Sequence, residues 1–147
     1  MSMVDISAKP EVYREAKAKG TIKLKAETIR LIREREIAKG DPFQVAKVAG
    51  ILAAKNTSSL IPLCHPLPLT GIEVELHLVD DSVVEVETIV RTRAQTGVEM
   101  EALAAAAAAL LTVWDMTKQY EKEKNGQYPH TKIQELRVVS KMKETPA

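Results

Sequence analysis

Cysteine and histidine side chains adjoin once in this sequence, at Cys64 and His65 in the proline-rich segment 60–69. Such a pair can belong to a metal site, can be a thiolate nucleophile activated by an imidazole, or can be neither. Adjacent residues are poor ligands for one tetrahedral metal ion, and the sequence has no second cysteine–histidine cluster. Neighbouring side chains of extended backbone also point to opposite sides. We therefore expect no metal ion, with Cys64 as a small buried hydrophobe and His65 held in one direction by the flanking prolines.

Asp115 and Lys118 form a second candidate for chemistry, because at a spacing of three they are neighbours on one face of a helix. The ordinary interpretation is a surface ion pair worth less than about 1 kcal/mol. The alternative is a pair that holds and releases a proton beside a substrate. Two more carboxylates, Glu99 and Glu101, stand near the start of the same helix. They either interact favourably with the positive end of the helix dipole or belong to the same site.

The long helix that carries these groups also separates them. Glu101 and Asp115 lie on nearly the same face, but fourteen residues apart, which is about 21 Å along the axis. One small-molecule pocket cannot easily use both from one chain. Six consecutive alanines at 104–109 keep the helix thin, so that an antiparallel copy could approach closely and bring Glu101 near the partner's Asp115. We hypothesise active sites shared between subunits.

The elements that must position these residues follow from the spacing of apolar residues. Helical spacing predicts helices at 26–36, 42–55 and 97–122, the second beginning with Asp41 as N-cap and Pro42 in the first turn. Alternation predicts a β-hairpin over 71–91 and a last strand over 131–142, and a short strand ends near residue 24. One α+β domain over residues 1–147 is the simplest organisation. In the long helix, the predicted core-facing stripe is Met100, Leu103, Ala107, Leu110 and Trp114.

Composition limits the classes of function. The chain has 147 residues, of which 45% are hydrophobic and only 3% aromatic, so its core must be aliphatic and rich in alanine. A net charge of +1 gives no electrostatic argument for nucleic acid as a partner. The single cysteine excludes an intrachain disulfide. We find no signal peptide and no apolar stretch of membrane-spanning length, and expect a cytoplasmic protein without a membrane partner.

Several stretches of the chain, taken in order, resemble one protein family. They are MVDISAK at 3–9, KGDPF at 39–43, AGILAAKNT at 49–57, LIPLCHPLPL at 60–69, TGVEMEAL at 96–103 and WDMTK at 114–118. Together they resemble the MoaC family, the cyclic pyranopterin monophosphate synthases of molybdenum-cofactor biosynthesis. The resemblance covers about residues 3–122. Its Leu-Cys-His-Pro and Thr-Gly-Val-Glu-Met-Glu motifs are the most specific.

The resemblance implies a reaction and an assembly. Members of the family convert (8S)-3′,8-cyclo-7,8-dihydroguanosine 5′-triphosphate to cyclic pyranopterin monophosphate with release of pyrophosphate, a lyase reaction for which we expect no cofactor. They have a ferredoxin-like α+β subunit, with an antiparallel sheet packed against helices. They assemble as homohexamers, trimers of dimers, with active sites at subunit interfaces. The implied partner is therefore a small molecule derived from GTP.

The functional positions of the family fall on residues of this chain. The expected catalytic residues are Asp115, as base or orienting partner, and Lys118, whose pKa could be lowered by desolvation beside other cations so that it transfers protons. Lys39, in a turn before a helix, suits a triphosphate or the departing pyrophosphate. The substrate-binding positions that the resemblance implies are Lys39, Cys64, His65, Glu99, Met100, Glu101 and Lys141.

The resemblance weakens in the tail. The family commonly has an arginine followed by Lys-Ser-Gly-Gly, and the lysine belongs to its site. Here Arg137 is followed by Ser140 and Lys141, but the segment 142–144, Met-Lys-Glu, replaces the serine and glycines. The geometry of Lys141 therefore stays open.

Three other functions are compatible with parts of the sequence. A non-enzymatic oligomeric nucleotide-binding module would use the same lysines but release its ligand unchanged. A purely structural protein would use the alanine helix for assembly, and Lys118→Ala would then abolish no activity. A metal-dependent hydrolase would need more ligands than Cys64 and His65 provide.

Overall fold

The computed structural model describes residues 1–144, which form a four-stranded sheet and four helices. The sheet order is β2-β3-β1-β4, and each neighbouring pair is antiparallel. Two long helices connect the strands in the β-α-β-β-α-β order of ferredoxin-like domains, so the predicted α+β fold is confirmed. The elements are β1 (Val12–Lys23), α1 (Ala26–Arg33), α2 (Pro42–Lys55), α3 (Thr57–Leu60), β2 (Leu69–Leu78), β3 (Val83–Ala94), α4 (Glu99–Glu121) and β4 (Lys132–Lys143).

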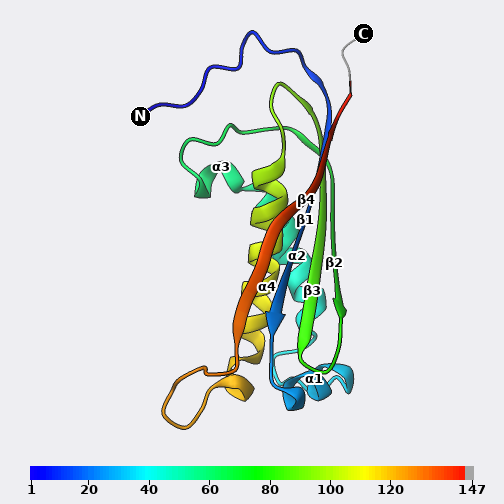
Figure 1. Cartoon of the computed structure of the whole chain (residues 1–147), viewed down its shortest axis with the longest axis vertical. Coiled ribbons are helices and arrows are strands. Elements are labelled where there is room, and N and C mark those ends of the chain that lie inside the picture. Colours follow the sequence, from blue (N-terminus) through cyan, green and yellow to red (C-terminus); the bar gives the residue numbers. More distant parts are fainter. Residues whose placement is uncertain (145–147) are drawn as a thin grey trace.

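Helices α2 and α4 cover one face of the sheet (Figure 1). Alternate residues of β1 and β3 point towards them, as a strand with one covered face requires. The core is aliphatic and rich in alanine, as the composition predicts. Its fully buried members include Ala16, Ala18, Ile22, Val84, Val86 and Val90 of the sheet, and Ala102, Ala105, Ala106, Ala109, Leu110 and Val113 of α4.

The alanine run of α4 lets other backbones of the same chain come close. A Cβ added at Gly50 of α2 would lie 3.1 Å from the carbonyl oxygen of Ala105. A Cβ at Gly20 of β1 would lie 2.8 Å from the side chain of Leu110. A side chain at Gly50 would press on the backbone of α4, whereas one at Gly20 would meet the movable end of Leu110. Glycine therefore matters most where α2 meets α4, and part of the alanine run is already used inside the subunit.

The predicted core-facing stripe of α4 is only partly right: Leu110 lies in the core and Leu103 and Trp114 pack against it, but the fully buried face includes the alanines beside them. Met100 is 41% exposed, and only Leu110 of the five predicted residues is fully buried. The sheet and α2 cover the alanine side of the helix, because small side chains permit the closest approach. Met100, Leu103 and Trp114 lie at its margins, where there is room for them.

The predicted boundaries of the second helix, the hairpin and the last strand hold to within about three residues. The first helix ends at Arg33 instead of residue 36, and the first strand differs more. Asp41 caps α2 by accepting a hydrogen bond from the amide of Phe43 at 2.9 Å, with Pro42 as first helical residue. The first strand is twelve residues long instead of short. Its inward positions include Arg14, Ala16 and Gly20 besides apolar residues, so the hydrophobic alternation in its sequence is weak.

By length and composition alone, α4 could cross a membrane, contrary to the expectation that no apolar stretch has that length. Half of its most apolar 18-residue window is buried, and the buried side packs against the sheet and α2. These features are typical of a core helix.

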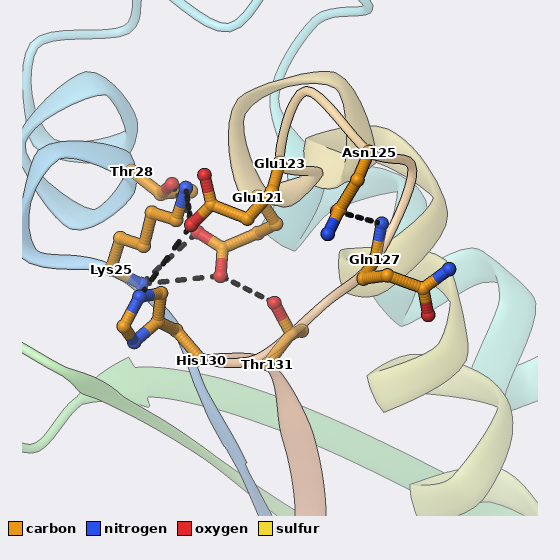
Figure 2. A network of polar contacts seen from close by, with 8 residues as sticks. All are labelled: Lys25, Thr28, Glu121, Glu123, Asn125, Gln127, His130 and Thr131. Atoms are coloured by element: carbon orange, nitrogen blue, oxygen red, sulfur yellow. Dashed lines mark hydrogen bonds and ion pairs between the residues drawn. The ribbon is translucent and has the colours of Figure 1, made fainter.

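A buried carboxylate fixes the end of α4 to two other elements (Figure 2). Glu121 is fully buried and accepts hydrogen bonds from the Lys25 amide at 3.0 Å and from the hydroxyls of Thr28 and Thr131. Lys25 is the N-cap residue of α1, and a lysine side chain has no acceptor atom. Glu121 therefore caps α1 from another part of the chain and joins α4 to the start of β4.

We expect Glu121→Ala to lower the free energy of unfolding by about 2 to 4 kcal/mol, because it leaves two buried hydroxyls and a part-buried amide without their acceptor. Glu123→Ala is the matched control, since Glu123 pairs with Lys25 and His130 at the surface and should cost less than about 1 kcal/mol. Denaturant unfolding at equal protein concentrations measures both. Equal losses for the two variants would contradict the role of Glu121.

Candidate active site

Three of the predicted site residues meet at the C-terminal end of α4. Lys118 Nζ lies 3.0 Å from Asp115 Oδ1, and Lys39 Nζ lies 3.4 Å from Asp115 Oδ2. Lys39 Nζ also donates to the backbone carbonyl of Asp115 at 3.1 Å. One carboxylate is thus held between two ammonium groups, one from its own helix and one from the turn that precedes α2.

The charges in this cluster determine which groups are ionised. Hydrogen bonds from Lys118 and Lys39 lower the pKa of the Asp115 carboxyl, so that it is a carboxylate at neutral pH. The same contact with Asp115 raises the pKa of Lys118. The expectation that desolvation lowers the pKa of Lys118 is therefore wrong for the single subunit, because this ammonium group is exposed and has a carboxylate partner.

A mostly apolar hollow of about 390 Å³ adjoins the cluster. It is lined by Leu111, Trp114, Asp115, Lys118 and Ile133. Trp114 packs at a tilt against Tyr128 of the loop before β4, with ring centroids 5.4 Å apart. Leu111, which is 59% exposed, leaves an apolar side chain in contact with solvent beside the charged pair. The cluster can therefore hold a charge or move a proton next to an apolar surface.

Glu101 and Cys64 contact each other at the other end of α4. Glu101 is only 3% exposed, and its Oε2 lies 3.9 Å from the Cys64 sulfur. Within residues 1–144 its Oε1 has no hydrogen-bond partner. Burial raises the pKa of Glu101, and the charge of Glu99 acts in the same direction. A buried carboxyl group without a full set of partners is a candidate for binding or proton transfer.

Cys64 differs in part from the expectation of a buried hydrophobe, since it is half-buried and touches a carboxyl group. Burial and the charge of Glu101 raise the pKa of the thiol, which argues against thiolate chemistry. The adjacent His65 contacts a different partner, with Nε2 2.6 Å from the carbonyl oxygen of Val4 in the N-terminal segment. Cys64 and His65 therefore do not converge on one point.

Glu99 and Lys141 line a cavity of about 360 Å³ near the start of α4. Lys9, Arg14, Gly97, Met142 and Lys143 complete its lining. Arg14 is buried in β1, and its Nε donates to the carbonyl oxygen of Ala94 at 3.0 Å. Its Nη2 is buried without a hydrogen-bond partner among the described residues. A buried guanidinium with a free donor, beside several lysines, suits an anionic ligand.

Sequence reasoning missed Arg14 and Lys9 as site candidates. Lys9 ends the MVDISAK stretch, which was used only for the resemblance. Arg14 occupies an inward position of β1, and a charged residue on the covered face of a strand is a signal that the sequence does contain. Because β1 was expected to be short, that position was not recognised. Met100 is exposed and is not among the residues that line the cavity.

The predicted site residues thus fall into two groups at opposite ends of the molecule. The first group, at the end of α4 near α1, is Lys39, Asp115 and Lys118; the second, at the start of α4 near α3 and the end of β4, is Cys64, His65, Glu99, Glu101 and Lys141 (Figure 1). Fourteen helical residues, or about 21 Å, separate Glu101 from Asp115. One subunit brings the members of the first group into contact, whereas in the second group Cys64 meets Glu101, Glu99 and Lys141 share a cavity, and His65 contacts the N-terminal segment. The two groups stay apart.

We expect Lys118→Met to raise the pKa of Asp115 more than Lys39→Met does, because the hydrogen bond from Lys118 is the largest cause of the lowered value. Carbon-13 NMR titration of the carboxyl group measures both shifts. Lys47→Met is the control, since Lys47 pairs with Glu75 elsewhere and its loss should leave Asp115 unchanged. A larger shift for Lys39→Met would contradict this order.

The chain matches the MoaC family over residues 3–144. It is 58% identical over 141 residues to a Sulfolobus acidocaldarius protein named probable cyclic pyranopterin monophosphate synthase, an alignment that covers 96% of this chain and 98% of the relative. A Pyrococcus furiosus protein of the same name is 54% identical over 144 residues, covering 98% and 92%. A Methanothermobacter thermautotrophicus protein, 52% identical over 141 residues and covering 96% and 88%, is named probable cyclic pyranopterin monophosphate synthase accessory protein. From the family match and these identities over nearly the whole length, the chain belongs to the MoaC family.

Proposed function

We propose that this chain is a cyclic pyranopterin monophosphate synthase of molybdenum-cofactor biosynthesis, a phosphorus–oxygen lyase. It would convert (8S)-3′,8-cyclo-7,8-dihydroguanosine 5′-triphosphate to cyclic pyranopterin monophosphate and pyrophosphate. The observation that carries this proposal is the cluster of Lys39, Asp115 and Lys118 in a chain that matches the MoaC family over nearly its whole length. We further propose that residues 1–147 are a single cytoplasmic catalytic domain.

In this proposal Asp115 and Lys118 are the catalytic residues. Asp115 is a carboxylate at neutral pH and can accept a proton or orient the ammonium group of Lys118. In the single subunit the pKa of Lys118 is raised, so its side chain is an ammonium ion that can donate a proton. The contact of Lys39 with Asp115 favours a role at the reacting centre over the phosphate-binding role that its turn suggests.

The cavity at the start of α4 suits the phosphate groups of the substrate. Lys9, Arg14 and Lys141 line it with positive charge, and the buried Nη2 of Arg14 has no hydrogen-bond partner among the described residues, so it could donate to an anionic ligand. Glu99 lies at the same cavity and Glu101 beside Cys64. Carboxyl groups there can bind the N–H edge of a guanine or pterin ring. His65 can hydrogen-bond an oxygen of the substrate once its contact with Val4 is exchanged.

Both groups act on one substrate in this proposal, so they must come from different subunits. We propose the homohexamer of the family, a trimer of dimers, in which α4 of one subunit runs antiparallel to α4 of the next. The 21 Å separation, about the length of fourteen helical residues, supports this arrangement. Exposed apolar side chains offer contact surface: Leu111 of α4, Val45, Val48 and Leu52 of α2, and Leu136, Val139 and Met142 of β4.

The decisive experiment is incubation with the cyclised dihydro-GTP. We expect pterin product and pyrophosphate, and a loss of about 100-fold or more in turnover for Lys118→Ala, whose role in proton transfer no other group replaces. Lys47→Ala is the control for loss of a lysine charge, because Lys47 is partly exposed and pairs with Glu75 instead of Asp115. Binding of substrate that is returned unchanged by a folded oligomer would instead identify a nucleotide-binding module.

Complementation tests the shared site. Glu101→Gln and Asp115→Asn should each be inactive alone, because each disables one half of every site. In a mixed oligomer one site receives both intact halves, so we expect activity to return when the two variants exchange subunits. Subunit exchange is followed by mass spectrometry of the mixture. Exchange without any regained turnover would contradict sites built from two subunits.

A further inference from the structure

The turn between α1 and α2 determines where Lys39 lies. Ile37 at the start of the turn is only 6% exposed and anchors it to the core. Gly40 closes it, with φ of +115° and an amide that donates to the carbonyl oxygen of Ile37 at 3.1 Å. Lys39 between them is exposed and reaches Asp115 only through its flexible side chain. The position of its ammonium group therefore depends on the backbone of the turn.

Tyr120 holds that backbone from the side of α4. The phenol oxygen of Tyr120 accepts a hydrogen bond from the amide of Ala38, the residue before Lys39, at 2.8 Å. Tyr120 belongs to the last turn of α4, as does Lys118. A tyrosine side chain has only two rotatable angles, so it transmits the position of its helix to the group that it binds.

The end of α4 is itself firmly fixed. Glu121, the next residue, is the buried carboxylate that joins α4 to Lys25, Thr28 and Thr131 (Figure 2). The contacts therefore form a continuous chain from the buried network through Tyr120 and Ala38 to Lys39. The positions of both ammonium groups at Asp115 therefore depend on the same turn, the last turn of α4.

We propose that Tyr120 is a positioning residue that keeps Lys39 at Asp115 by fixing the backbone of Ala38. Tyr120 acts through Lys39 and not on the substrate. The catalytic meaning of this contact rests on the proposed function, but the contact itself does not. Without the hydroxyl of Tyr120, the turn keeps the anchor at Ile37 and loses the bond next to Lys39.

An NMR titration tests the contact without any substrate. Lys39 is one of the two groups that lower the pKa of Asp115, the other being Lys118. Tyr120→Phe, which removes only the hydroxyl, should therefore raise the pKa of Asp115, measured by carbon-13 NMR. In a Lys39→Met background the same change should have no effect. An unchanged pKa in Tyr120→Phe, or an equal rise in the Lys39→Met background, would overturn the proposal.

Tyr13→Phe is the matched control, because its hydroxyl contacts Glu15 on the sheet at 3.5 Å and not the turn. It should leave the titration of Asp115 unchanged, and a rise as large as that of Tyr120→Phe would count against a specific role. Thermal unfolding of each variant, compared with the wild type, shows whether the fold is retained.

Turnover of the cyclised dihydro-GTP extends the test to catalysis. We expect Tyr120→Phe to lower kcat/KM about fivefold, the order expected for one hydrogen bond. In the Lys39→Met enzyme, Tyr120→Phe should cause no further loss, since its effect passes through Lys39. Additive losses would overturn a positioning role. If the wild-type protein forms no product, the proposed function fails, while the titration still decides the role of Tyr120.

Discussion

The close packing of α4 is the constraint on which the rest of the structure depends. Its alanine face lies so near to α2 that a Cβ at Gly50 would come within 3.1 Å of the Ala105 carbonyl. Each alanine buries little area, so this stability comes from many small contacts in a close fit. The rise of about 1.5 Å per residue keeps the ends of this 23-residue helix apart, and its close packing fixes the helix on the sheet. The separation of the two groups of charged residues is therefore built into the fold.

Much of this fold can be predicted from local signals. The Asp41–Pro42 start of α2 and the alternation of the hairpin rest on single residues or short patterns, and the structure confirms both. The core side of α4 could not be predicted in the same way. A prediction from hydrophobic spacing places the largest apolar side chains in the core. The sheet and α2 instead pack closely against the face of α4 that carries the smallest side chains. The true length of β1 is hidden for the same reason, because Ala16 and Gly20 face α4 with little hydrophobicity.

The sequence indicates which residues of the candidate site carry chemistry. It does not indicate which contacts hold them in place. The pairing of Asp115 with Lys118 follows from helical spacing, whereas the approach of Lys39 depends on the packing of α1 and α2 against α4. The partners of Glu121 are separated from it by as many as 96 residues, so no spacing rule identifies them. The burial of Arg14 could not be predicted, because it depends on β1, and the hydrophobic alternation of the sequence indicates only the end of that strand.

The electrostatics of the two ends suggest why a shared site would suit this chemistry. In one subunit Lys118 is exposed and paired with Asp115, so its ammonium form is favoured. In the proposed assembly an antiparallel neighbour would cover Lys118 and bring its cation-lined cavity to the same site. Desolvation and a neighbouring cation both disfavour the ammonium form. The partner's Glu101 would favour the ammonium form of Lys118 only slightly, because burial favours the neutral form of Glu101. Assembly that completes the pocket would thus also lower the pKa of Lys118 towards the range that proton transfer requires.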